Sequence, residues 1–252
     1  MELEAGKKIY FLSDFHLGAP DYAQSLVREK KIVAFLQQIR SDAALIIIAG
    51  DIFDFWFEYK TVVPKYFVRL LGKLAEITDS GIPVMLFAGN HDMWMRDYFE
   101  KEMHIPVYFE PKEFQWNGQQ FYIGHGDGLG PGDHGYKMLK KIFRNPLCQW
   151  LFGVLHPDWG IALANFFSRK SRAKTGAADA IFLGEDKEWL VIFCKEILKQ
   201  KEVDYFIFGH RHLPMDIQLN EQSRYINLGD WIKHFTYAVF DGQQLSLQQW
   251  QQ

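Results

Sequence analysis

The sequence predicts an α/β protein, because apolar strands and amphipathic helices alternate along the first half of the chain. Apolar runs at residues 8–13, 44–49 and 83–88 are separated by stretches with helical periodicity, a pattern typical of βαβ units. The second run, "ALIIIAGD", is a continuous apolar segment of the kind that forms a buried parallel strand. A chain of 252 residues is long enough for one such domain with an added segment.

The remaining elements follow in order along the chain. The first strand, "KIYFLS", leads to a helix expected over residues 22–40, and further helices are expected near residues 63–79 and 186–201. The segment "FQWNGQQFYIGHGD" is typical of a β-hairpin, because Asn-Gly favours the tight turns of two-residue hairpin loops. The strand "DYFIFGHRH" and antiparallel pairs in "MDIQLNEQSRYINLGDW" and "TYAVFDGQQLSLQQW" complete the chain.

Five of these apolar strands end in acidic, amide or imidazole side chains. Asp14 and His16 show the principle, because residues i and i+2 of an extended chain point the same way. The carboxyl ends of strands in α/β sheets form the crevice where ligands bind, so the polar side chains are expected to converge there. The converging residues are Asp14, His16, Asp51, Asn90, His125, His210 and His212.

This donor set predicts two divalent cations. It contains imidazoles, carboxylates and one amide but no thiolate, which favours Mn, Fe, Co or Zn. Two ions about 3.5–4 Å apart require a bridging carboxylate, and Asp51 is the natural candidate. Each motif alone is also typical of a turn, but burying so many titratable groups together without a metal would be costly.

A basic and aromatic segment lies between residues 134 and 176. It has eight basic residues and one acidic residue, against 20 basic and 30 acidic residues elsewhere. Such a patch on an acidic body suggests an anionic amphiphile or membrane headgroups, and the alternative is a packed helical pair with solvated lysines. We expect residues from about 128 to 180 to form a helical insertion over one end of the sheets.

We expect the protein to be located in the cytosol. Cys148 and Cys194 form no metal-type cluster and fit a reducing environment. The N-terminus lacks the apolar stretch of a signal peptide, and no apolar run approaches the ~20 residues that span a bilayer. Contact with a membrane surface stays open.

The order D-x-H, G-D-x-x-D, G-N-H-D, G-H-G-D and G-H-x-H resembles the calcineurin-like metallophosphoesterases over nearly the whole chain. The resemblance implies one domain, residues 1–252, built as a four-layer αββα sandwich with a dinuclear site at its apex. It implies that one ion is held by Asp14, His16, Asp51 and His212, and the other by Asp51, Asn90, His125 and His210. It also implies that His91 acts beside the phosphate as an acid or charge stabiliser, paired with Asp54.

Finer features resemble the UDP-2,3-diacylglucosamine hydrolase family of lipid A synthesis in Gram-negative bacteria. They are "FLSDFHLGA", "GDIFDFWFEY", "HGDG" followed by Asp133, and a helical insertion before "GHRH". The resemblance implies a manganese-dependent pyrophosphatase, in which an activated water attacks the α-phosphate of UDP-2,3-diacylglucosamine and releases UMP and 2,3-diacylglucosamine 1-phosphate (lipid X). It further implies a cytoplasmic enzyme bound peripherally to the inner membrane. The overall acidity argues against a nucleic-acid partner.

In this family the insertion is a lid that holds acyl chains. The resemblance implies acyl contacts from the aromatic residues Phe143, Trp150, Phe152, Phe166 and Phe167. It implies substrate contacts from Asn90, Asp133, Ser168, Arg172, Lys174 and His210.

One departure bears on the substrate. The best-known members of the family have arginine where this chain has His91, so the chain either uses histidine for the same task or acts on another substrate. A phosphodiesterase or phosphatase for a soluble nucleotide or phosphoprotein would not explain the aromatic, basic insertion. A non-catalytic scaffold of the same fold is expected to have lost metal ligands, yet all seven positions are filled here.

Overall fold

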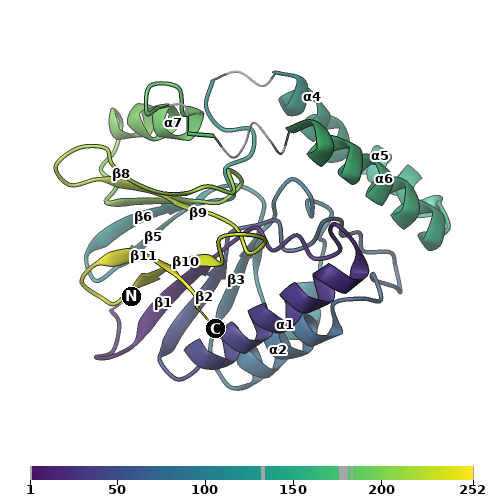
Figure 1. Ribbon diagram of the computed structural model, residues 1–252, viewed down its shortest axis with the longest axis horizontal. Helices are drawn as coiled ribbons and strands as arrows, with labels where there is room; N and C mark the ends of the chain where they lie inside the picture. Colours follow the sequence, from purple (N-terminus) through teal and green to yellow (C-terminus); the bar gives the residue numbers. More distant parts are fainter. Residues whose placement is uncertain (1, 132–133, 176–180, 183, 252) are drawn as a thin grey trace.

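The computed structural model describes residues 2–131, 134–175, 181–182 and 184–251, which form a four-layer αββα sandwich (Figure 1). The predicted fold class is therefore confirmed. The strands of the first sheet are β1 (Lys8–Leu12), β2 (Ala43–Ile48), β3 (Val84–Phe87), β4 (Val107–Tyr108), β10 (Thr236–Phe240) and β11 (Leu245–Gln249). Their order is β11-β10-β1-β2-β3-β4, and β1 to β4 run parallel.

The second sheet has the order β5-β6-β7-β9-β8, with parallel pairing of β6, β7 and β9. Its strands are β5 (Lys112–Trp116), β6 (Gln119–Ile123), β7 (Tyr205–Phe208), β8 (Pro214–Gln218) and β9 (Arg224–Leu228). The predicted hairpin is β5–β6. Its turn residues Asn117 and Gly118 have φ values of 48° and 78°, as a type I′ turn requires.

Helices cover the outer face of each sheet. They are α1 (Tyr22–Ile39), α2 (Val68–Asp79) and α3 (Tyr98–Met103) on the first sheet, and α7 (Trp189–Leu198) on the second. Figure 1 shows α1 and α2 on one side of the sandwich and α7 on the other. The expected start of α2 near residue 63 is wrong, because Phe67 precedes the helix with a left-handed φ of 68°.

Apolar side chains fill each space between the layers. Phe11, Ile47, Phe121 and Ile226 belong to the cluster between the two sheets. Because β1 and β2 are covered on both faces, their sequences are almost continuously apolar rather than alternating.

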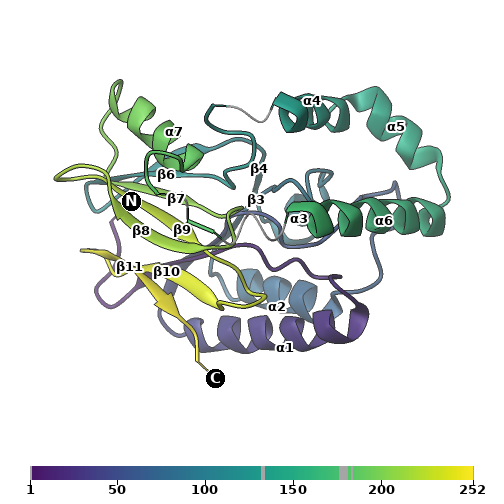
Figure 2. The same cartoon turned by 45° about the horizontal axis from the view of Figure 1, so that its top comes forward.

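Three further helices form an insertion between β6 and α7. They are α4 (His134–Phe143), α5 (Pro146–Val154) and α6 (Pro157–Thr175), in agreement with the helical segment expected there. Figure 2 shows them projecting beyond the sandwich, with α4 and α5 along one side and α6 along the other. None of the helices in the described ranges is long and apolar enough to cross a bilayer.

Candidate metal centre

Loops at the carboxyl ends of five strands bring all seven predicted ligands to one place. The loops follow β1, β2 and β3 in the first sheet and β6 and β7 in the second. The ligand atoms of one set lie within 4.8 Å of one another, and they belong to Asp14, His16, Asp51 and His212. The same limit encloses a second set, which contains Asp51, His125 and His210.

Asp51 is common to both sets. Its Oδ2 atom lies 3.5 Å from Nε2 of His16 and 3.3 Å from Nε2 of His125. Asn90 belongs to the second set, because its Oδ1 atom lies 2.8 Å from Nδ1 of His210. A carboxylate between two groups of nitrogen and oxygen donors is the arrangement that a dinuclear centre requires.

The charges at the centre fit cations. Burial raises the pKa of Asp51, but the neighbouring imidazoles, His125 first, outweigh it and hold that pKa well below its ordinary value. Burial lowers the pKa of His125, yet the charge of Asp51 raises it to about 10. Burial and the charge of His125 lower the pKa of His210 to about 4. The charge of the buried Asp51 carboxylate is thus balanced by a proton on the imidazole of His125, and divalent ions would balance the same charge in its place.

The backbone of the ligand loops is unusual. Five of the seven predicted ligands have left-handed φ values between 43° and 68°, namely Asp14, His16, Asp51, His210 and His212. Residues other than glycine adopt this region at a cost of about 1–2 kcal/mol each, so the surrounding structure must hold them there. The extended conformation expected for Asp14 and His16 is therefore wrong, and the loop after β1, not the alternation of a strand, brings their side chains together.

Buried polar residues behind the ligands hold these loops. The carboxylate of Asp92 accepts hydrogen bonds from the amides of Ile52 and Gly89, both at 2.7 Å. The guanidinium of Arg28 in α1 donates to the carbonyl oxygen of His16 at 2.7 Å. Sequence reasoning assigned no role to Asp92 or Arg28. Two features of the sequence could have indicated these roles. Asp92 is the last residue of the G-N-H-D motif, and Arg28 is a charged residue on the buried face of α1.

Gly89 allows the loop after β3 to approach the loop after β2. A Cβ atom at this position would lie 2.6 Å from the backbone nitrogen of Asp51 and closer still to its carboxylate. No side chain fits there, so the glycine of the G-N-H-D motif is a steric requirement of the centre.

Comparisons with known proteins show the family of this chain. The family described as calcineurin-like phosphoesterase matches residues 7–214. The chain belongs to this family. A protein from Porphyromonas gingivalis named UDP-2,3-diacylglucosamine hydrolase is 40% identical, over 96% of this chain and 97% of that protein. A protein of the same name from Ectopseudomonas mendocina is 29% identical, over 93% of this chain and 95% of that protein.

Among solved structures, a phosphoesterase from E. coli aligns over 95% of this chain and 91% of that chain, with 16% identity and a TM-score of 0.46. The family resemblance inferred from the motifs is confirmed by the family match and the hydrolase relatives. The chain is accordingly a metal-dependent phosphoesterase with a candidate dinuclear site.

His91 lies at the mouth of this phosphoesterase site. Its Nδ1 atom lies 3.1 Å from the backbone carbonyl oxygen of Asp54, whereas the nearest carboxylate oxygen of Asp54 is 3.6 Å away. The expected partner is therefore present, but its closer contact with His91 is made by the backbone. The hydroxyl of Ser168 in α6 lies 3.2 Å from the same nitrogen.

The other expected substrate contacts are described only in part. Ser168 reaches the site, and Asn90 and His210 are partly exposed beside it. Asp133 lies outside the described residues, as do the side chains of Arg172 and Lys174.

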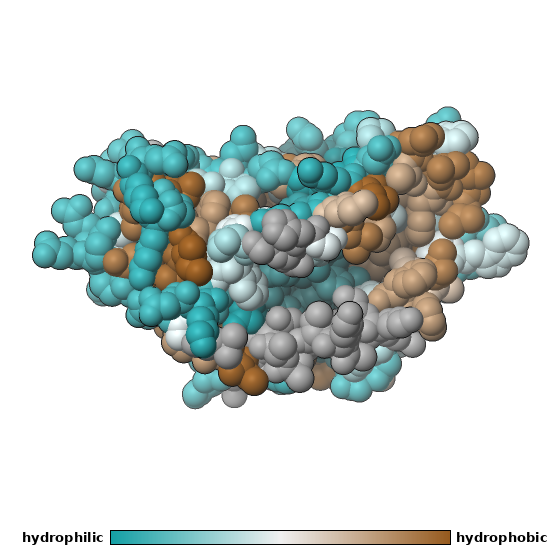
Figure 3. All heavy atoms as spheres, turned by 90° about the horizontal axis from the view of Figure 1, so that it is seen from above, coloured by the Kyte–Doolittle hydropathy of each residue, from teal (hydrophilic) through white to brown (hydrophobic). Residues whose placement is uncertain are grey.

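The five aromatic residues expected to contact acyl chains divide into two groups. Phe152 packs against Phe57 and Trp94, with ring centroids 4.8 and 4.7 Å apart, and Phe143 also packs against Trp94. The second group is exposed and consists of Trp150, Phe166 and Phe167. Figure 3 shows apolar side chains gathered on both sides of a hollow at the end of the molecule formed by α5 and α6. Phe143 and Phe152 thus dock the insertion on the body, whereas Trp150, Phe166 and Phe167 are exposed.

Proposed function

We propose that the protein is a UDP-2,3-diacylglucosamine hydrolase. The observation that carries the proposal is the 40% identity to the Porphyromonas gingivalis protein of that name, which extends over nearly the full length of both chains. In the proposed reaction a water oxygen forms a bond to the α-phosphorus of UDP-2,3-diacylglucosamine. The bond from that phosphorus to the oxygen shared with the sugar phosphate breaks, giving UMP and 2,3-diacylglucosamine 1-phosphate.

The seven ligand residues would hold two divalent ions, which we propose to be manganese. Bound ions of this kind polarise phosphate oxygens and lower the pKa of a coordinated water. Asp51, which is 1% exposed and so shielded from bulk water, would supply the carboxylate shared by the two ions. The donor set of nitrogen and oxygen atoms suits manganese.

His91 would orient and neutralise the phosphate. A carbonyl oxygen only accepts hydrogen bonds, so the contact with Asp54 keeps the proton of His91 on Nδ1. The other nitrogen, Nε2, is then left to receive or donate a proton at the substrate. A histidine in this role replaces the arginine of the family's best-known members.

We further infer that the chain is one phosphoesterase domain whose insertion, from about residue 128 to 180, acts as a lid. Exposed apolar side chains on α5 and α6 support contact with acyl chains and a peripheral position on the inner membrane, and these include Trp150, Phe166 and Phe167. Asp133, Arg172 and Lys174 remain proposed substrate contacts, and no nucleic-acid partner is proposed.

The test is to load the protein with manganese, add UDP-2,3-diacylglucosamine and measure UMP. We expect rapid release that is abolished by a chelator and by the substitution Asp51→Asn. Absence of UMP from a protein that still cleaves a chromogenic phosphodiester would overturn the substrate and leave the phosphoesterase.

A further inference from the structure

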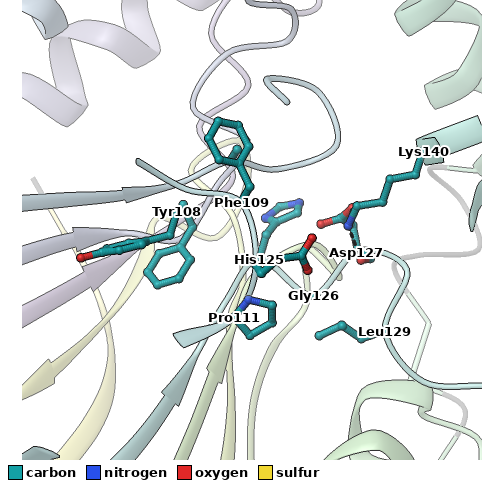
Figure 4. A pocket seen from close by; sticks show the side chains of 11 residues that line it. Tyr108, Phe109, Pro111, His125, Gly126, Asp127, Leu129 and Lys140 are labelled. Atoms are coloured by element: carbon teal, nitrogen blue, oxygen red, sulfur yellow. Dashed lines mark hydrogen bonds and ion pairs between the residues drawn. The ribbon is translucent and has the colours of Figure 1, made fainter. Parts of the chain in front are cut away.

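Helix α4 is attached to the metal centre by two of its side chains. The hydroxyl of Tyr136 donates to Oδ2 of Asp127 at 2.5 Å, and Nζ of Lys140 lies 2.6 Å from the same oxygen. Lys140 also donates to the backbone carbonyl of Asp127 at 3.1 Å. Figure 4 shows the Lys140 side chain reaching from α4 to Asp127 beside His125.

Asp127 is part of the backbone segment that places His125. It lies two residues after that ligand, and it is only 5% exposed. Gly126 between them has a φ of 113°, a value that other residues rarely adopt. The backbone oxygen of His125 accepts a hydrogen bond from the amide of Gly209 at 2.9 Å, and the contacts of the Asp127 side chain add a second restraint on the C-terminal side of His125.

The ammonium group of Lys140 is therefore engaged in contacts within the protein. A small recess beside them is lined by His125, Asp127 and Lys140 together with residues of the loop after β4. Arg144, which directly follows α4, likewise pairs with Glu110 and donates to the carbonyl oxygen of Phe109. These basic residues of the insertion therefore join α4 to the body instead of facing a headgroup.

We propose that Lys140 and Tyr136 are positioning residues for the metal centre. Through Asp127 they hold the loop that carries His125, and they thereby set the affinity for the ion bound by His125, Asn90 and His210. The inference rests on the proposed function, since it requires that His125 is a metal ligand. In this interpretation α4 anchors the insertion to the body and supports the dinuclear site.

The experiment compares full-length Lys140→Met and Tyr136→Phe with the wild-type protein. Manganese affinity and stoichiometry are measured by titration, and the coupled ion pair is followed by electron paramagnetic resonance. We expect affinity for one of the two ions to fall by about 10–100-fold, as is usual when a partner of a ligand loop is removed. The spectrum should change from a coupled pair towards a single ion, and kcat should fall while KM stays nearly constant.

The matched control is Lys199→Met, which removes an exposed lysine–carboxylate pair with Glu196 at the C-terminal end of α7. It should leave metal binding and kinetics as in the wild type. The double variant Asp127→Asn/Lys140→Met tests whether Lys140 acts through Asp127. If it does, the double variant should lose little more metal affinity than Asp127→Asn alone.

Three outcomes would overturn the inference. They are two ions bound with wild-type affinity in Lys140→Met, a rise confined to KM, and additive losses in the double variant. A wild-type protein that binds no ion pair would instead refute the proposed function. Tyr136→Phe retains the ring and its packing, so it remains informative if Lys140→Met folds poorly.

Discussion

The backbone carbonyl of Asp54 lies 3.1 Å from Nδ1 of His91, nearer than its own carboxylate at 3.6 Å. The orientation of His91 therefore depends more on where residue 54 lies than on its side chain. We expect Asp54→Asn to lower kcat by less than about tenfold, below the usual contribution of a catalytic acid or base. A larger loss in a steady-state assay would assign the orienting role to the carboxylate.

Replacing His91 itself should be more damaging. We expect His91→Ala to lower kcat by about 10²–10⁴-fold, the range for removal of a general acid or base. The protein should still bind two ions, because the side chain of His91 is outside the seven-residue ligand set. Elemental analysis of the variant, measured alongside its kinetics, shows whether His91 is a metal ligand. Loss of an ion from the variant would show that it is.

Asp51 should be the residue on which both ions depend. Its Oδ2 atom is within 3.5 Å of imidazole nitrogens of both ligand sets, so Asp51→Asn is expected to reduce metal content below two ions per chain and abolish turnover. Metal analysis after dialysis measures the first effect. Retention of both ions would show that the bridge lies elsewhere.

Gly89 and Gly72 form a matched pair for testing steric crowding at the centre. A Cβ at Gly89 would meet the backbone and carboxylate of Asp51, whereas a Cβ at Gly72 in α2 meets nothing within 4 Å. Gly89→Ala should destabilise the protein by about 1–3 kcal/mol and weaken metal binding. Gly72→Ala should stabilise it by about 0.5–1 kcal/mol through helix propensity. Urea unfolding curves measure the change in the free energy of unfolding for each variant. Similar changes in the two variants would contradict the steric argument.

Asp92 should stabilise the centre without touching an ion. Asp92→Ala would leave the buried amides of Ile52 and Gly89 without their acceptor, at a cost of about 1–3 kcal/mol for each. Unfolding of the metal-free variant measures this loss, which metal depletion alone cannot explain. A metal-free variant as stable as the metal-free wild type would refute the role.

The proposed lid should matter for lipid and not for small substrates. Phe166 is 61% exposed, and burying such a side chain against an acyl chain contributes about 1.5–3 kcal/mol. Phe166→Ser is therefore expected to raise KM for the lipid substrate about tenfold or more and leave cleavage of a chromogenic phosphodiester unchanged. Val27→Ser, at an exposed position of α1, is the control, and equal effects on both substrates would argue against a lid.

The convergence of the seven candidate ligands could be predicted from sequence because each one follows an apolar strand within four residues. The strand places the residue at the carboxyl edge of a sheet, and residue type then identifies the chemistry, as for Asp14 and His125. The contacts of Lys140 with Asp127 and of Phe152 with Trp94 had no such local signal. They depend on how the insertion lies on the body, which neither periodicity nor spacing specifies. The late start of α2 was missed because it depends on the backbone conformation of one residue, Phe67.

The two ligand sets draw on both ends of the chain. His16 and His212 have Nε2 atoms 3.0 Å apart although 196 positions separate them in the sequence. During synthesis, Asp14 and His16 leave the ribosome early, but the four-residue set is incomplete until β7 and the loop after it have emerged. Neither ion site can therefore be complete before residues 210 and 212 have been synthesised, and a chain that stops before residue 210 would lack a ligand of each set.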